Sequence, residues 1–170
     1  MGKTLIAYYS RAGENYVSGS LRWLERGNTL RVAEQIATLT GGDLYEIRQK
    51  TPYAEGYNDC IEEARRDKEA DARPAIFPLP EDLAAYDTVY LGYPNYWGTV
   101  PMAVCTFLTS GDFSGKTIRP FCTHEGSGLG TSVRDIRRLC GTANVKEGLA
   151  VHGSRIAGAE KTIEGWVKEI

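Results

Sequence analysis

The chain has 170 residues, enough to bury a substantial core, and this length suits a single domain spanning residues 1–170. Lysine and arginine together number 20 and aspartate and glutamate 22, so the formal net charge is −2. This near balance, without long runs of one sign, argues against nucleic acid or a membrane surface as the partner.

Strand and helix signals alternate along the sequence. Short runs rich in β-branched and aromatic residues predict strands over 4–9, 43–48, 88–93, 117–123 and 145–153. Apolar residues at helical spacing, or residues that favour a helix start, predict helices from Leu30 to Ala37, over 60–72 with Asn58 or Asp59 as the cap, from Pro101, from Val133 to Cys140 and from Ile163 to Ile170.

This alternation predicts an α/β protein whose strands form one parallel sheet between layers of helices. The first, third and fourth strands are almost wholly apolar, which is typical of central strands covered on both faces. The second strand is more polar, so we expect it at an edge. Ligands bind such sheets beyond the carboxyl ends of the strands, and the loops that leave strands one, three and four are therefore the candidate binding loops.

The four cysteines are far apart in the sequence and form no CxxC pair. Three of them have apolar neighbours, which predicts buried free thiols in a reducing compartment. The sequence shows neither the apolar stretch and cleavage site of a signal peptide nor a window apolar enough for a membrane span. We therefore expect a cytoplasmic protein.

The first loop begins with "SRAG", but the predicted helix starts only after a later "GNT". Ser10, Asn28 and Thr29 offer small polar side chains, and the helix start directs free amides and its positive dipole end to the same place, which suits a phosphate. We interpret residues 14–26 as an insertion that splits a phosphate-binding turn, with Arg11 as a further contact. Two other readings stay open: Asn28 as a simple helix cap and Arg11 as a solvated side chain.

The second loop, "YPNYWGTVP", places Tyr96 and Trp97 at the carboxyl end of a strand, followed by Gly98. Aromatic rings in such a position favour a flat ligand stacked against them. The alternative is that Trp97 folds back to cover the core.

The third loop, "THEGSGLGTS", is rich in glycine and leads into an amphipathic helix. It matches neither the Walker A pattern nor GxGxxG, so its significance is its position beside the aromatic loop. His124 lies in this loop without further ligands at metal-binding spacing. We therefore expect a hydrogen-bonding histidine here and no metal site.

These three loops together resemble those of flavodoxins, over nearly the whole chain. The segments "YSRAGENY", "GYPNYWGTVPM" and "PFCTHEGSGLG" resemble a bacterial flavodoxin-like subgroup with an insertion in the first loop. The resemblance implies a doubly wound, five-stranded parallel sheet of order 2-1-3-4-5 and FMN as the cofactor. It assigns cofactor contacts to Ser10, Arg11, Asn28, Thr29 and Leu30 in the phosphate turn, to Pro94, Asn95, Tyr96, Trp97 and Gly98 in the aromatic loop, and to Thr123, His124, Gly126, Gly128, Leu129 and Gly130 in the glycine-rich loop.

The resemblance implies a redox protein that carries electrons between partner proteins, as a monomer or weak homodimer. The flavin would carry the chemistry, with no catalytic side chain. A second function stays open, because "PNYWGTVP" also resembles the aromatic loop of flavodoxin-like NAD(P)H:quinone reductases. In that case the partners would be NAD(P)H and a small acceptor.

Overall fold

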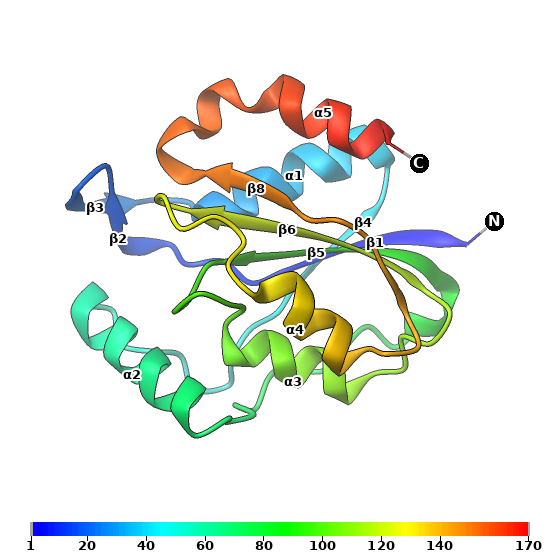
Figure 1. The fold of residues 1–170 in the computed structure, drawn as a ribbon, viewed down its shortest axis with the longest axis horizontal. Helices are drawn as coiled ribbons and strands as arrows, with labels where there is room; N and C mark the ends of the chain where they lie inside the picture. Colours follow the sequence, from blue (N-terminus) through cyan, green and yellow to red (C-terminus); the bar gives the residue numbers. More distant parts are fainter. Residues whose placement is uncertain (1, 170) are drawn as a thin grey trace.

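A central parallel sheet organises the computed structural model, which describes residues 2–169 (Figure 1). Its strands follow the spatial order β4 (Asp43–Glu46), β1 (Lys3–Tyr8), β5 (Tyr86–Pro94) and β6 (Thr117–His124), and two short segments, β7 (Asn144–Val145) and β8 (Leu149–His152), both pair with β6. All of these pairings are parallel.

The expected strand order 2-1-3-4-5 is confirmed, with one refinement at the fifth position. The strand expected over 145–153 is divided into β7 and β8, which run along different stretches of β6. The expected polar edge strand is β4, which pairs on one side only, with β1.

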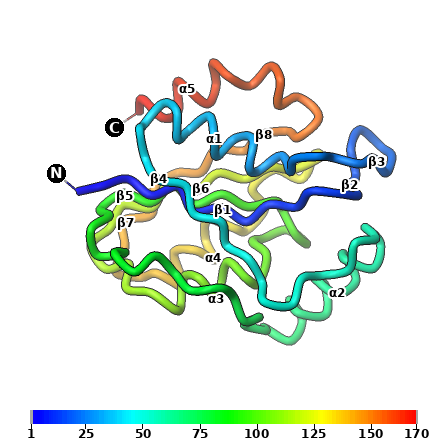
Figure 2. The backbone as a smooth tube through the Cα atoms, turned by 180° about the vertical axis from the view of Figure 1, so that it is seen from behind, coloured from blue at the N-terminus to red at the C-terminus, as the bar shows by residue number. Residues whose placement is uncertain are grey.

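Helices cover both faces of the sheet (Figures 1 and 2). One face carries α1 (Asn28–Thr40) and α5 (Glu160–Lys168), and the other carries α3 (Met102–Ser110) and α4 (Ser132–Leu139). The helix α2 (Tyr57–Glu69) lies at the side of the molecule, and two 3-10 turns, η1 (Leu83–Ala85) and η2 (Gly153–Gly158), precede β5 and α5.

Alternate residues of the central strands supply two separate cores, because successive side chains of a strand point to opposite faces. Leu5 and Ala7 of β1 pack on the side of α3 and α4, whereas Ile6 and Tyr8 pack on the side of α1 and α5. The apolar character of these strands thus follows from burial on both faces.

Two expected helix starts are displaced, the start of α3 by one residue and the cap of α2 by two or three. Asn58 and Asp59 lie inside α2, whose N-cap is Gly56, and α3 begins at Met102 with Pro101 as its N-cap. Neither N-cap residue makes a side-chain capping bond. In α2 the amide of Tyr57 donates instead to the carboxylate of Glu14, in the inserted segment.

The inserted segment forms a β-hairpin of its own. Strands β2 (Gly13–Val17) and β3 (Ser20–Leu24) pair antiparallel, with Val17 opposite Ser20. Ser18 and Gly19 between them have φ values of 50° and 88°, the pattern of a type I′ hairpin turn. The hairpin lies next to the start of α1 and extends toward α2 (Figure 2).

All four cysteines are buried and free, as the sequence predicts. Within residues 2–169, no helix combines the length and apolar character that crossing a membrane requires. The same residues contain no group of three or more histidine, cysteine, aspartate or glutamate side chains able to hold a metal ion.

Candidate ligand-binding site

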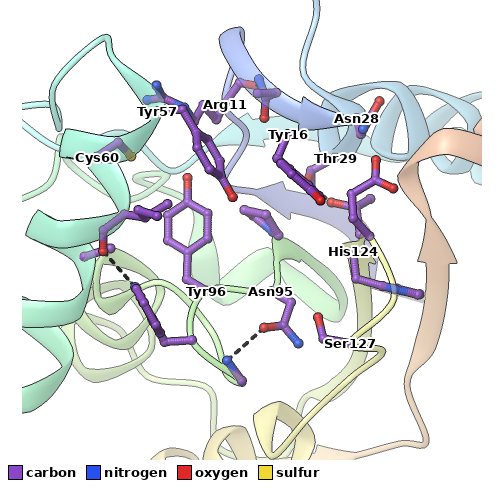
Figure 3. Close-up of a pocket in the computed structure, with 18 residues that line it drawn as sticks. Arg11, Tyr16, Asn28, Thr29, Tyr57, Cys60, Asn95, Tyr96, His124 and Ser127 are labelled. Carbon is purple, nitrogen blue, oxygen red and sulfur yellow. Dashed lines mark hydrogen bonds between the residues drawn. The ribbon is translucent and has the colours of Figure 1, made fainter. Parts of the chain in front are cut away.

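A cavity of about 430 Å³ lies at the carboxyl ends of the central strands (Figure 3). Because β1, β5 and β6 are adjacent and parallel, the loops that follow them leave the same edge of the sheet. Ten of the residues expected at the site line this cavity: Arg11, Asn28, Thr29, Pro94, Asn95, Tyr96, Trp97, Gly98, Thr123 and His124. The three loops therefore meet around one space.

The polar end of the cavity is built where the first loop meets the start of α1. The hydroxyl of Ser10 accepts a hydrogen bond from the amide of Leu30 at 3.1 Å, so Ser10 caps this helix from outside it. A side chain at Gly27 would collide with Ser10, which explains the glycine there. Thr29 is 2% exposed and its hydroxyl lies 2.8 Å from that of Thr123.

Asn28 is not the cap of α1. The N-cap is Gly27, and no side chain caps the helix from that position. The Asn28 side chain instead lines the cavity, next to the first turn of a helix whose earliest amides have no acceptor within the helix. This end of the cavity thus presents amide donors, two hydroxyl groups and a carboxamide.

Arg11 lines the cavity, but its guanidinium is bound to backbone carbonyls. It donates to Glu14 at 3.0 Å, to Ala54 at 3.2 Å and to Glu55 at 2.6 Å. Arg11 is therefore not a solvated side chain. It connects the inserted hairpin to the segment that precedes α2.

The aromatic end of the cavity is a tight turn between Tyr96 and Thr99, which exchange backbone hydrogen bonds of 2.9 and 3.2 Å. Trp97 and Gly98 occupy its centre with φ values of 55° and 83°. A tryptophan in this left-handed region costs on the order of 1–3 kcal/mol, a strain that the surrounding contacts must hold in place.

Trp97 does not fold back onto the core. The residue is 44% exposed, and its Nε1 donates to the carbonyl of Ile61 in α2 at 2.8 Å. Lys68 of the same helix donates to the carbonyl of Trp97 at 2.5 Å. The ring therefore stands between α2 and the cavity, available for stacking.

Tyr96 contributes a second ring to this end. It lies edge-on to Tyr9, with ring centroids 5.9 Å apart. Burial raises the pKa of the Tyr96 hydroxyl well above its usual value, so the group stays protonated near neutral pH.

The glycine-rich loop braces the aromatic turn. Asn95 donates to the carbonyl of Gly128 at 2.8 Å and accepts from the amide of Gly98 at 2.9 Å. The carbonyl of Gly98 accepts from the amide of Thr131 at 2.8 Å. A side chain at Gly130 would collide with that carbonyl, and its φ of 55° is also one that favours glycine.

Six expected site residues do not line the cavity: Ser10, Leu30, Gly126, Gly128, Leu129 and Gly130. The first two bond each other at the helix start, and the amide of Gly126 donates to His124. Leu129 packs against the hydrophobic core. The glycines of this loop serve packing and turn geometry, and its cavity-lining residues are Thr123, His124, Glu125 and Ser127.

His124 is a hydrogen-bonding loop residue. Its Nδ1 accepts from the amide of Gly126 at 2.9 Å, which requires a lone pair on that nitrogen. Partial burial and the nearby His152, whose ring centroid lies 5.2 Å away, lower the pKa of His124. The neutral imidazole is therefore the form that the fold favours.

Sequence reasoning missed the residues that line the far side of the cavity. They are Asn15 and Tyr16 in the hairpin and Tyr57, Cys60, Ile61 and Ala64 in α2. The one sequence feature that points to them is the aromatic content of the insertion, because a tyrosine in a polar segment is expected to pack against another part of the chain.

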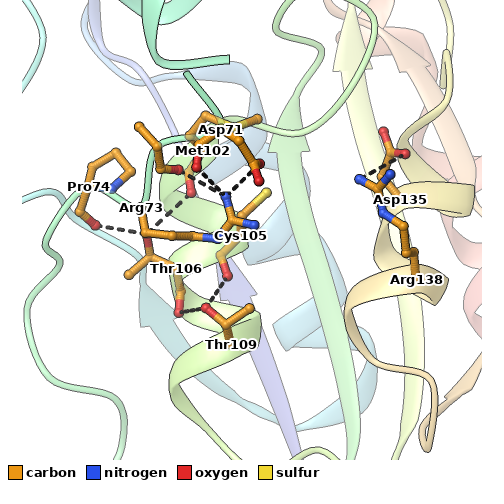
Figure 4. A network of polar contacts seen from close by, with 10 residues as sticks. Asp71, Arg73, Pro74, Met102, Cys105, Thr106, Thr109, Asp135 and Arg138 are labelled. Carbon is orange, nitrogen blue, oxygen red and sulfur yellow. Dashed lines mark hydrogen bonds and ion pairs between the residues drawn. The ribbon is translucent and has the colours of Figure 1, made fainter. Parts of the chain in front are cut away.

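Asp135 of α4 holds two loops together from behind the turn. Its Oδ2 accepts from the hydroxyl of Thr99 at 2.6 Å and from that of Thr131 at 2.8 Å. Arg138 lies next to Asp135, at 3.7 Å (Figure 4). In the same view, Thr106 of α3 donates to the carbonyl of Pro74 at 2.8 Å and fixes the segment that follows α2. Burial opposes ionisation of Asp135, but these hydrogen bonds outweigh it and lower the pKa.

Replacement of Asp135 by alanine is expected to lower the free energy of unfolding by about 1–3 kcal/mol, since two hydroxyl groups lose a charged acceptor. Urea unfolding of Asp135→Ala measures this loss. Glu81→Ala is the matched control, because Glu81 is an exposed carboxylate without a hydrogen bond among the described residues. Equal stability of the two variants would contradict the bracing role of Asp135.

His124 is expected to make stability depend on pH. Its pKa is lower in the folded than in the unfolded chain, where it is about 6.5, so the unfolded chain binds the proton more readily. The contribution of neutral His124 to the free energy of unfolding is complete above the unfolded pKa and is lost as the pH falls toward the folded pKa. On acidification the urea midpoint of the wild type should therefore fall more than that of His124→Asn. Midpoints that change equally with pH in the two proteins would contradict the lowered pKa of His124.

The family model described as Flavodoxin matches residues 3–170. A candidate flavoprotein from Bacteroides uniformis is 28% identical, with 99% of each chain covered and a TM-score of 0.78. One from Bacteroides eggerthii is 29% identical, with 96% of this chain and 98% of the other covered and a TM-score of 0.74.

A flavoprotein from Lactobacillus acidophilus, solved in complex with FMN, is 21% identical over 93% of this chain and 98% of its own, with a TM-score of 0.68, a likeness that concerns the fold. The search of curated proteins found no match. Because the family model covers nearly every residue, the chain belongs to the flavodoxin family.

Proposed function

We propose that the chain binds FMN in this cavity and carries electrons between partner proteins. The observation that supports it most is the pairing, within one cavity, of a polar end at a helix start with an aromatic end at the Tyr96–Thr99 turn. FMN has a matching shape, a planar ring joined by a polar chain to a phosphate. FMN-bound structures within the same fold support the choice of ligand.

The residues fit the phosphate of FMN at the start of α1. A phosphate there would meet the first amides of the helix, its positive dipole end, and the side chains of Asn28 and Thr29. Ser10 already bonds the Leu30 amide, so its hydroxyl proton remains free to donate toward the phosphate.

The residues also fit the ring at the opposite end. Trp97 offers a partly exposed indole held by its bond to Ile61, and Gly98 and Asn95 lie next to it on the cavity wall. Bound FMN supplies the redox chemistry of such a protein. The chain itself binds the two ends, fixes the plane of the ring and excludes water from its inner face.

The test is a titration of the purified protein with FMN, followed by the flavin's fluorescence and visible spectrum. Wild-type protein should bind FMN in a saturable manner and change both the fluorescence and the visible spectrum of the flavin. Trp97→Ala should weaken binding by roughly 1 kcal/mol, or about fivefold or more, because a stacked ring is lost.

Trp97→Phe keeps an aromatic ring at the same turn and should retain most of the affinity. Absence of FMN binding by the folded wild-type protein would end the proposal as a whole. Unchanged affinity of Trp97→Ala would remove only the stacking role of that residue.

The reductase alternative uses the same cavity, so reduction of the loaded protein separates the two functions. Anaerobic addition of NADPH to the FMN-loaded protein should leave the visible flavin absorbance unchanged if the chain is a carrier. Rapid bleaching, followed by recovery when a quinone is added, would instead establish an FMN-dependent NAD(P)H oxidoreductase. The buried free thiols are consistent with either function in a reducing cytoplasm.

A further inference from the structure

Two tyrosines to which the resemblance assigns no cofactor contact form a stacked pair at the cavity. Tyr16 comes from the inserted hairpin and Tyr57 from the start of α2, yet their ring centroids lie 6.2 Å apart with an interplanar angle of 25°. Both line the cavity. In Figure 3 their rings stand side by side at one margin of the cavity, with Asn95 and Ser127 at the other.

The pair leaves aromatic surface facing the cavity. Tyr16 is 43% exposed despite its contact with Tyr57, which is a large apolar surface to leave against water. The adjoining wall is made of Cys60, Ile61 and Ala64 of α2, which offer no charged group. This margin therefore suits a flat, largely apolar surface rather than a charged or strongly hydrated group.

The backbone that carries the pair is fixed by specific bonds. The carboxylate of Glu14, two residues before Tyr16, accepts a hydrogen bond from the amide of Tyr57 at 2.8 Å. Arg11 adds its bonds to the carbonyls of Ala54 and Glu55, just before α2. The hairpin and the start of α2 thus form one unit, and the two rings keep their mutual position because of it.

We propose that Tyr16 and Tyr57 form a second aromatic wall that covers the outer face of the bound ring, opposite the wall made by the Trp97 turn. The inserted hairpin is then part of the binding site, and Glu14 is a positioning residue that sets the wall by capping α2. This inference rests on the proposed binding of FMN and adds to it the residues that enclose the ring.

The closing experiment compares FMN titrations and the visible circular dichroism of the bound flavin across hairpin variants. Tyr16→Ala and Tyr57→Ala should each raise the dissociation constant roughly two- to tenfold and change the dichroism of the flavin bands, since a stacked ring is lost. Tyr16→Phe should keep the wild-type dissociation constant and flavin dichroism, because the ring and not the hydroxyl provides the wall. Glu14→Ala should accelerate FMN dissociation in stopped-flow measurements.

Trp23→Ala is the matched control, since Trp23 is a 68% exposed aromatic residue of the same hairpin that does not line the cavity. It should bind FMN as the wild type does. If Tyr16→Ala and Tyr57→Ala match Trp23→Ala in affinity and in flavin dichroism, the second wall does not exist. If folded wild-type protein fails to bind FMN, the proposed function itself fails, which is a separate result.

Discussion

The parallel pairing of β1 with β5 and of β5 with β6 is the constraint on which the rest of the structure depends. It forces three loops that are distant in the sequence to leave the sheet at one edge, where the first loop, the Trp97 turn and the glycine-rich loop surround one cavity. Because both faces of these strands are buried under helices, the edge cannot shift without disrupting two cores at once.

The meeting of three loops at one edge would not by itself make them rigid. A network of side-chain hydrogen bonds fixes their positions around the cavity. Asn95 and Asp135 both link the Trp97 turn to the glycine-rich loop, one from the cavity side and one from behind. These bonds oppose the strain of a tryptophan in the left-handed region. The Trp97 ring is thereby held in place without a ligand, which would reduce the ordering cost of binding FMN in the proposed site.

The edge position of β4 follows from local sequence patterns, whereas the sheet order and the full set of ten cavity-lining site residues were implied by the resemblance to flavodoxins. Several of the differences have one physical cause, a bonding partner that is distant in the sequence. Asn28 and Asn58 have the right chemistry for helix caps, but Ser10 bonds the first turn of α1 and Glu14 bonds the first amide of α2. Likewise Gly130 permits close packing against the carbonyl of Gly98, a use that no pattern in its own loop indicates.

The two non-local caps lie within one short segment, and this gives the insertion its importance. Ser10 organises the polar end of the cavity, whereas Glu14 and Tyr16 organise the margin formed with α2. Loop-closure entropy grows only slowly with loop length, so the hairpin costs the fold little. In return, a single continuous stretch of chain contributes both to the end of the cavity suited to a phosphate, through Ser10, and to the margin suited to a ring, through Glu14 and Tyr16.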